Sequence, residues 1–346
     1  PWLELGRIDG LATARMALFD VPAILELNRQ GILTGSATEQ LRDADSKALL
    51  DGGLAFLSVL QARIGLALGE LYEKRLTELS RYIGERAAAG GTSPAEADRL
   101  KARVANVRSQ LADSRAQLQS AVRNLERLQG PAPRALALTG ARSILVPVDE
   151  DEAVAAAKRS NAELAAARIE IRAASEEARI SRARFLPKLE VELTHSRAKN
   201  PSGSAGVTHD TKAMLVLSVN TLNGGTDLAQ SRAAEARRQE LEARALASER
   251  RLQLDIETAY ANLKASSERF VTVREELEGN RRVVDAFQAQ LVGGNRPLLD
   301  VLDAYQRHYQ SQVDLTQVMV STAQNEWRLA HITGSLGPQL GRPSVR

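Results

Sequence analysis

The chain has 346 residues, but only 3% of them are aromatic and none is a cysteine. The scarcity of aromatic side chains argues against a large spherical core, and the lack of cysteine excludes disulfides, thiolate nucleophiles and zinc–cysteine sites. Lysine and arginine (46 residues) nearly balance aspartate and glutamate (43 residues), and both signs are interspersed, so no basic stripe indicates a nucleic-acid partner.

Ala, Leu, Arg, Glu and Gln dominate the chain, which is typical of long helices with narrow apolar faces. No basic-then-apolar leader opens the sequence, so we expect a secretory signal to have been removed or to lie outside it. We expect no membrane-spanning helix, because no stretch approaches about 18 to 20 consecutive apolar residues. Any membrane crossing would therefore be made by strands.

The sequence contains an internal repeat: residues of the first half match residues of the second half at a constant distance along the chain. This distance, which we call the offset, is the one between Ala55 and Ala259. A second, shorter offset pairs residues 1–5 with 187–191, and the difference between the two offsets places a length change in a hairpin loop. Each copy reads as strand, loop, strand, very long helix, glycine turn and shorter helix. The pairs matched by the first offset are Ala55/Ala259, Phe56/Tyr260, Gly90/Gly294, Glu96/Asp300, Leu111/Leu315, Leu125/Leu329 and Gly130/Gly334.

Residues 1–20 are predicted to form the first β-hairpin. Glu4 alternates with leucines, and Asp9-Gly10 is a strong turn signal before a strand over about residues 11–19.

Residues 21–148 are predicted to form a first helical hairpin and an equatorial segment. No proline follows Pro22 before about residue 88, a helix of about 100 Å at 1.5 Å per residue. Gly90-Gly91 permits the chain to reverse, and Ser93-Pro94 starts a helix that ends near residue 130.

The second half repeats this order. Residues 149–186 are predicted to form one linking helix, and residues 187–223 a second hairpin in which Glu190 and Glu192 alternate with leucine and valine. Residues 224–346 are predicted to form a second helical hairpin and a C-terminal equatorial segment, with the turn at Gly293-Gly294.

The strands determine the expected fold class. Their edges carry unpaired N–H and C=O groups, and four strands are too few to close around a lumen. Several chains would therefore share one barrel. The predicted fold class is mainly α with a membrane β-barrel, built by an oligomer.

The sequence resembles the TolC family of outer-membrane exit ducts over essentially the whole chain. Residues 294–304 are similar to the family's second periplasmic turn and the start of its last long helix, and residues 186–191 to its entry into a barrel strand. The resemblance implies a homotrimer in the outer membrane of a Gram-negative bacterium, with four strands from each protomer in one twelve-stranded barrel, surrounded by outer-membrane lipid. It also implies a periplasmic α-helical barrel and, as partners, a periplasmic adaptor (membrane fusion) protein and an inner-membrane transporter.

The resemblance further implies a gate at the periplasmic tip. Asp300 and Asp303 match the family's acidic ring, Arg296 its tethering arginine, and Glu96 the acid with which that arginine pairs. In a trimer the two aspartates would form a constriction of six carboxylates that attracts cations. Taken alone, they are also compatible with an ordinary solvated face just after a helix start.

The family's tip turns correspond to residues where this sequence departs from the usual pattern. Turns usually written Val-Gly-Leu and Val-Gly-Thr align with two glycine-rich triplets, and the tyrosine usual near the tether is replaced by Leu291. The residues expected to form the tips and to dock the adaptor are Ala89, Gly90, Gly91, Gly293, Gly294 and Asn295.

The remaining candidate residues and motifs indicate a channel that catalyses no reaction. Glu4, Glu190 and Glu192 are predicted to face the barrel lumen, although the polar face of a soluble sheet gives the same alternation. The four histidines show no metal-ligand spacing, and neither a phosphate loop nor a nucleophile elbow is present, so we expect no metal, cofactor or enzymatic activity.

The sequence therefore predicts a passive outer-membrane exit duct of a tripartite transport system. It would serve type I protein secretion, multidrug efflux or both, with secretion slightly favoured by the similarity of residues 296–303 to ducts of that class. The alternative is a soluble or filament-forming coiled-coil scaffold, such as a periplasmic adaptor.

Overall fold

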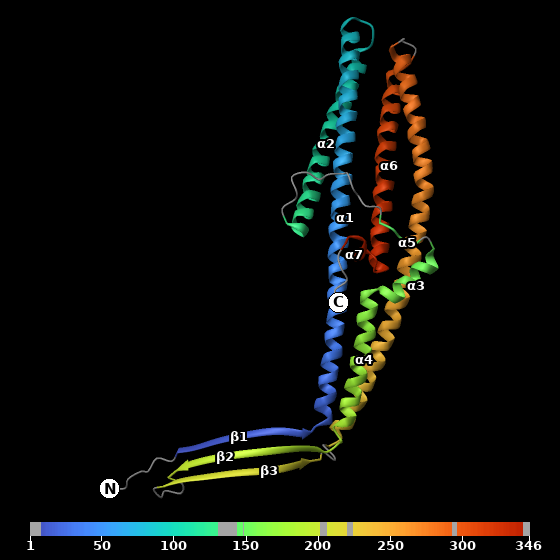
Figure 1. The fold of residues 1–346 in the computed structure, drawn as a ribbon. Coiled ribbons are helices and arrows are strands. Elements are labelled where there is room, and N and C mark those ends of the chain that lie inside the picture. The colour runs from blue at the N-terminus through green and yellow to red at the C-terminus, as the bar shows by residue number, and fades with distance from the viewer. Residues whose placement is uncertain are drawn as a thin grey trace, which may run out of the picture. The chain divides into compact units, whose positions relative to one another are not determined.

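The computed structural model describes residues 8–130, 144–147, 149–200, 206–219, 224–292 and 296–341 (Figure 1). The chain divides into two units, one made of residues 1–40 and 163–249 and the other of residues 41–162 and 250–346. Its elements are β1 (Ile8–Phe19), α1 (Val21–Ala88), α2 (Pro94–Gln129), α3 (Glu150–Ser160), α4 (Ala162–Ala183), β2 (Lys188–Lys199), β3 (Val207–Ser218), α5 (Thr226–Val292), α6 (Leu298–Ile332) and α7 (Leu336–Gln339).

The helices confirm the internal repeat. The long helices α1 and α5 end at Ala88 and Val292, and the shorter helices α2 and α6 start at Pro94 and Leu298. Both pairs are separated by the same offset that relates Ala55 to Ala259 in the sequence. The chain leaves both shorter helices near a glycine with positive φ, +81° at Gly130 and +72° at Gly334. The two helical hairpins therefore share one register, as the sequence comparison predicts.

The described strands form one antiparallel sheet in the order β1-β2-β3. Asp9 and Gly10 lie inside β1, opposite Ala198 and Arg197, so the predicted turn at Asp9-Gly10 is wrong. Pairing with β2 overrides the local turn preference, because strand formation depends on cross-strand neighbours more than on intrinsic propensity. The part of the predicted hairpin that precedes β1, residues 1–7 with Glu4, lies outside the described residues.

The sheet has two chemically different faces, because directly paired residues in neighbouring strands point to the same side. The register places the carboxylates of Asp9, Glu190, Glu192 and Asp210 together on one side, which we call the carboxylate face. On this face Arg15 Nε lies 3.1 Å from Glu192 Oε2. The opposite face carries three apolar rows: Phe19/Leu189/Leu217, Met16/Val191/Leu215 and Ala14/Leu193/Ala213.

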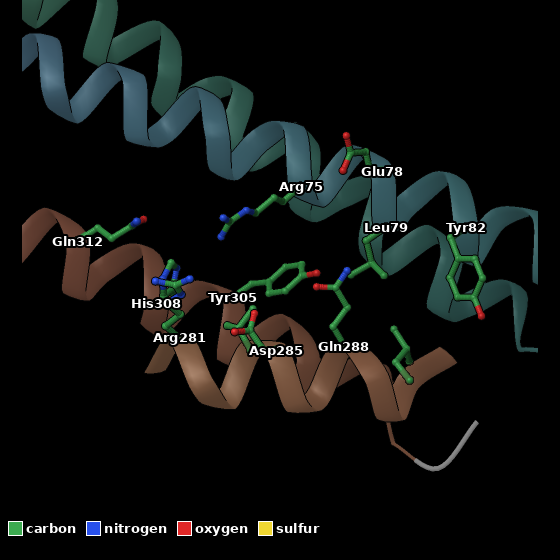
Figure 2. A pocket seen from close by; sticks show the side chains of 12 residues that line it. Arg75, Glu78, Leu79, Tyr82, Arg281, Asp285, Gln288, Tyr305, His308 and Gln312 are labelled. Carbon is green, nitrogen blue, oxygen red and sulfur yellow. The ribbon is translucent and has the colours of Figure 1, made fainter. Parts of the chain in front are cut away.

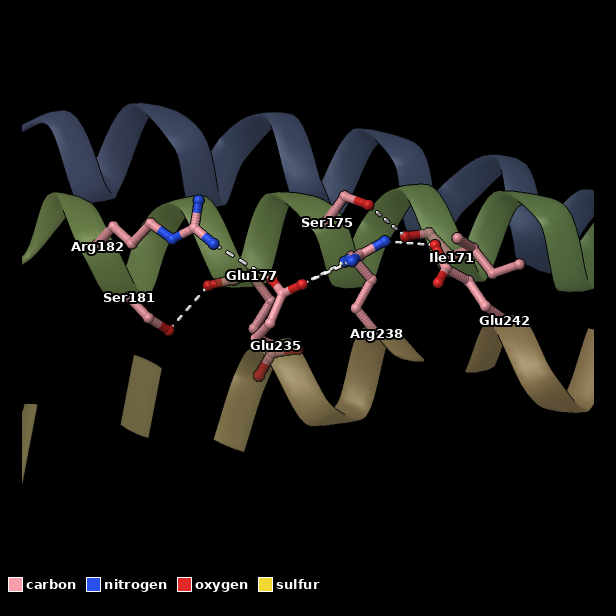
Figure 3. A network of polar contacts seen from close by, with 8 residues as sticks. All are labelled: Ile171, Ser175, Glu177, Ser181, Arg182, Glu235, Arg238 and Glu242. Atoms are coloured by element: carbon pink, nitrogen blue, oxygen red, sulfur yellow. Dashed lines mark hydrogen bonds and ion pairs between the residues drawn. The ribbon is translucent and has the colours of Figure 1, made fainter. Parts of the chain in front are cut away.

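Polar contacts hold the helices of the strand-bearing unit together. Figure 3 shows Arg182 of α4 reaching Glu235 of α5, at 3.3 Å, while Arg238 pairs with the same carboxylate at 2.6 Å. In α1, Arg29 and Gln30 donate hydrogen bonds to Glu26 and lower the pKa of that carboxyl to about 2. These charges belong to helix packing and lie outside the sheet.

The linking segment contains two helices rather than the single helix predicted. The chain is extended at Asn161 (φ −67°, ψ 123°), whose Nδ2 donates to the carbonyl of Ile332 at 3.0 Å. A Cβ atom at Gly334 would lie 2.4 Å from the carbonyl oxygen of Ser160, so the segment after α6 packs directly against the break. The break between α3 and α4 therefore coincides with this tertiary contact. It contains neither a glycine nor a proline.

The second unit has its core between the two helical hairpins. One cluster of buried side chains joins α1, α2, α5 and α6, and Leu76, Leu100 and Val301 are fully buried in it. Elsewhere Trp327 of α6 packs against α1 at Gly53, where a Cβ atom would lie only 2.1 Å from the indole ring. Trp327 therefore fills a packing site between helices.

The apolar character of α1 differs from the prediction. This helix contains an 18-residue window with a mean hydropathy of 1.5 and at most two charged residues, so the expectation that no helix has the composition of a membrane span is wrong. Composition alone does not separate a span from a helix packed within protein. Ala55 and Val59 of α1 pack against Leu125 of α2, so apolar residues of this helix join the first helical hairpin.

Candidate functional site

The first helical tip is a glycine-terminated reversal. The N–H of Gly91 donates to the carbonyl of Arg86 at 2.7 Å and the N–H of Gly90 to that of Ala87 at 3.1 Å, which is the Schellman pattern. Gly90 has φ +76°, a conformation that residues with a side chain rarely adopt. Together with Ala89, these glycines form the turn predicted between α1 and α2.

Glu96 occupies the third position of α2. Ser93 caps the helix by accepting the N–H of Ala95 at 3.2 Å, and Pro94 fills the first helical position. The Thr92 hydroxyl donates to the Glu96 carboxylate. An acid at this position is stabilised by the helix dipole, so its placement also fits a purely structural role.

The second tip carries the predicted gate residues. Gly293, Gly294 and Asn295 lie outside the described residues, whereas Arg296, Pro297 and α6 are described. Asp300 is the third residue of α6, the same position that Glu96 has in α2. Arg296 Nε lies 3.2 Å from Asp300 Oδ2, but the angle is not that of a hydrogen bond, and this N–H has no acceptor among the described residues.

Arg296 also contacts the other helix of its hairpin. Its guanidinium carbon lies 3.7 Å from the ring centre of Phe287 on α5, within the range of a cation–π contact. Next to it Leu291, the residue at the family's tyrosine position, is buried. Within the described part of one chain, Arg296 therefore ties α5 to α6, and its expected pairing with Glu96 remains a prediction.

Asp303 has an arginine partner of its own. Arg307 Nη2 lies 2.8 Å from Asp303 Oδ2, and the two side chains are 69% and 55% exposed. The other side of this helix, with Val301, Ala304 and Tyr305, is buried in the core. The two aspartates thus lie away from the packed side of α6, and a guanidinium accompanies each of them.

The pairing changes the electrostatics expected of the constriction. Two carboxylates and two guanidiniums at the start of α6 balance each other in each chain. At the predicted constriction, the charge that an ion would meet therefore depends on whether the pairs stay closed. The i,i+4 spacing of Asp303 and Arg307 is visible in the sequence, whereas the contact of Arg296 with Phe287 depends on how α5 and α6 pack.

A charged cavity lies between α1, α5 and α6 and was not predicted. Its volume is about 680 Å³, and Figure 2 shows Arg75 of α1 facing Arg281 and His308 across it. His308 is buried, and its pKa is lowered by burial and by both arginines, against the opposing effect of Asp285. No signal in the sequence indicated this cavity, because the residues around His308 come from three helices.

The predicted lumen residues that the structure describes share one side of the sheet. Glu190 and Glu192 both lie on the carboxylate face, and Glu4 lies outside the described residues. Within the described ranges, no group of three or more histidines, cysteines or acids has metal-site geometry.

Comparison with known proteins gives the family and the fold. The sequence profile of the family described as outer membrane efflux protein matches residues 153–335, just over half of the chain. No curated protein matches the sequence significantly.

Several solved structures of channel proteins resemble the chain. CusC aligns with 95% of this chain and 78% of its own, with a TM-score of 0.84 at 16% identity. The outer-membrane channel CmeC of Campylobacter jejuni aligns over 96% of this chain and 78% of its own (TM-score 0.80, 10% identity). The open state of the MtrE channel of Neisseria gonorrhoeae aligns over 96% and 81% (TM-score 0.78, 15% identity).

These comparisons confirm the TolC-like fold and the resemblance to TolC-like channels. Proteins of the family are outer-membrane channels of Gram-negative bacteria that extend into the periplasm, and they act as trimeric components of tripartite efflux pumps with adaptor proteins. The match to this family favours the interpretation as an exit duct over the alternative of a coiled-coil scaffold. The chain belongs to the outer membrane efflux protein family.

Proposed function

We propose that this chain forms the passive exit duct of a tripartite transport system, with three copies closing one membrane barrel. The observation that carries this proposal is the open sheet. Among the described strands, β1 and β3 each pair only with β2, so both outer edges are unpaired. An open edge is not tolerated in hydrocarbon, and strands from other copies would pair with it.

The sheet faces support the same proposal. Acids and their cations gather on the carboxylate face, while the three apolar rows occupy the opposite face. A transmembrane barrel needs this arrangement, with polar residues toward the lumen and apolar residues toward lipid. Glu190 and Glu192 would then line the lumen. The function is transport, without a catalytic step or a cofactor.

Reconstitution tests the proposal. The full chain should remain with the membrane fraction until detergent is added, and the purified protein should open discrete ion-conducting channels in planar phosphatidylcholine bilayers. A matched preparation heated to unfold the protein serves as the control. A chain that stays in the aqueous fraction without detergent and never conducts would contradict the proposal.

We further propose that the start of α6 is the periplasmic gate, with Asp300 and Asp303 at the constriction and Arg296 as a tether. The gate would open when an adaptor docks on the helical tips and shifts these ion pairs. Glu96 would receive Arg296 from a neighbouring subunit in the closed state. The exposed position of Asp303, the half-exposed position of Asp300 and the helix position that Glu96 shares with Asp300 support this assignment.

The cargo class is type I secreted protein, small toxic molecules or both. Deleting the gene and scoring two phenotypes separates them: loss of a secreted protein from the medium indicates secretion, and increased sensitivity to antibiotics or detergents indicates efflux. Complementation with the wild-type gene is the control. A deletion that affects neither phenotype would contradict this assignment.

A further inference from the structure

The acidic side chains of the described sheet lie on one face only, whereas basic side chains lie on both faces. A polar lumen accounts for the charges of the carboxylate face but not for the basic residues of the opposite face. All four carboxylates of the described strands lie on the carboxylate face. The three cations on that face are each paired, at 3.0–3.2 Å: Arg15 with Glu192, Lys188 with Asp20 and Lys212 with Asp210.

The opposite face carries cations without acids. Arg197 and Lys199 lie there near the end of β2, next to the imidazoles of His195 and His209, whose ring centres are 6.3 Å apart. Neither Arg197 nor Lys199 makes an ion pair with any residue in the described part of the chain. We call these four residues, His195, Arg197, Lys199 and His209, the basic row.

The basic row lies at a definite depth along the strands. Ten residues separate Leu189, in the first apolar row, from Lys199, and eight separate it from Arg197. At about 3.4 Å per residue and a tilt of about 40°, these spacings become about 26 Å and 21 Å along the membrane normal. Because the apolar band of an outer-membrane barrel is about 25 Å tall, Lys199 lies at its far boundary and Arg197 about 4 Å short of it.

The far boundary is the outer leaflet. The helices connect to the sheet at the other end, at Phe19 and Lys188, and this family extends its helices into the periplasm. The basic row lies near the β2–β3 connection, which would face the cell exterior.

The basic row is open to a ligand. Along β2 the residues of this side from Leu193 onward are exposed, whereas those of the carboxylate face are half-buried. In the strand pairing, Gly10 stands beside Arg197 and contributes no side chain to this face. A headgroup could therefore approach the guanidinium from the side of β1.

We propose that the basic row binds the phosphate groups of the phosphorylated glycolipid that forms the outer leaflet, with Arg197 and Lys199 as the main ligands. This inference rests on the proposed barrel. Guanidinium and ammonium groups without carboxylate partners, at the depth of the headgroups, favour phosphate. The site would anchor the barrel in the outer leaflet and fix its height.

Lipid titration of the purified full chain tests this proposal. Binding of bis-phosphorylated lipid A is compared with that of its dephosphorylated form and of phosphatidylglycerol, in the wild type and in R197Q/K199Q. Each cation near an anionic surface contributes a factor of about five, so the double variant should bind lipid A about 25-fold more weakly. The matched control, R15Q/K212Q, removes the same charge from the carboxylate face and should change binding less than about threefold.

Four results would overturn the assignment: equal binding of the two lipid A forms, equal binding of phosphatidylglycerol, wild-type affinity in R197Q/K199Q, or an equal loss in R15Q/K212Q. The duct itself is tested separately, by conductance of the wild type in phosphatidylcholine bilayers, which contain no such glycolipid. If the wild type conducts but fails the lipid test, the proposed phosphate binding by the basic row is refuted and the proposed duct is not.

Discussion

Neutralising the two aspartates proposed for the gate should make the channel prefer anions. In each chain Asp300 pairs with Arg296 and Asp303 with Arg307, at 3.2 and 2.8 Å. The double variant D300N/D303N removes both carboxylates and leaves both guanidiniums. In a trimer the constriction would change from balanced to carrying six uncompensated positive charges.

The size of the effect follows from Coulomb's law. At about 8 Å in water containing 0.1 M salt, each guanidinium changes the energy of a monovalent ion by slightly more than 0.2 kcal/mol. Six of them together change it by about 1.4 kcal/mol, or about tenfold, in opposite directions for cations and anions. The ratio of cation to anion permeability should therefore fall by about two orders of magnitude.

The fold should survive the substitution. Exposed i,i+4 ion pairs contribute about 0.3 to 0.5 kcal/mol each, and the interaction of Asp300 with the helix dipole adds at most about 1 kcal/mol. A loss of about 1 to 2 kcal/mol per chain leaves most domains folded. A change in conductance can then be attributed to charge.

The assay is the reversal potential in planar bilayers across a potassium chloride gradient. D300N/D303N should become anion-selective and lose block by a trivalent cation, while R296Q/R307Q should become more cation-selective. D98N removes an exposed carboxylate from the start of α2 and should leave selectivity unchanged. Wild-type selectivity in D300N/D303N would refute the placement of these residues at the constriction.

Three further predictions concern the structure. Gly53→Ala should lower stability by about 1 to 3 kcal/mol, because its methyl group would overlap the Trp327 ring, and a smaller residue at 327 should restore part of it in thermal unfolding. Gly334→Ala should lower the melting temperature more than Gly337→Ala, because only the first has positive φ and a backbone contact. Glu26→Gln should remove a pH-dependent loss of stability: the lowered pKa stabilises the fold above about pH 4.5, and this contribution is lost as the pH falls through about 2.

Each of these predictions can fail separately. An unchanged melting temperature in Gly53→Ala would mean that the Trp327 ring is not seated on α1. Equal effects of the two C-terminal glycine substitutions would remove the role of the contact with Ser160. A Glu26→Gln protein whose stability still falls between pH 4.5 and 2 as steeply as the wild type's would show that other carboxyls dominate in that range.

The repeat made most of the helical architecture predictable. Its single constant offset predicted that α2 and α6 start at matched positions, Pro94 and Leu298, because duplicated segments bury the same side chains. Gly90 marked its turn because a Schellman reversal favours a residue without a side chain.

Contacts distant in sequence decided what could not be predicted. Asp9-Gly10 carries a turn signal, but its place in the ladder depends on its partners Arg197 and Ala198, in the second half of the chain. The break at Asn161 depends on the carbonyl of Ile332, so no local pattern announces it. The partner of Arg296 on α5, Phe287, depends on helix packing in the same way.

The mass of the detergent-solubilised particle tests the central claim most directly. A barrel closed by three copies predicts a single species at three times 37.5 kDa in native mass spectrometry, with no folded monomer after the detergent is removed. A folded, monodisperse monomer of 37.5 kDa in detergent-free buffer would contradict the account, because the apolar rows and open edges of the sheet would then need no partner.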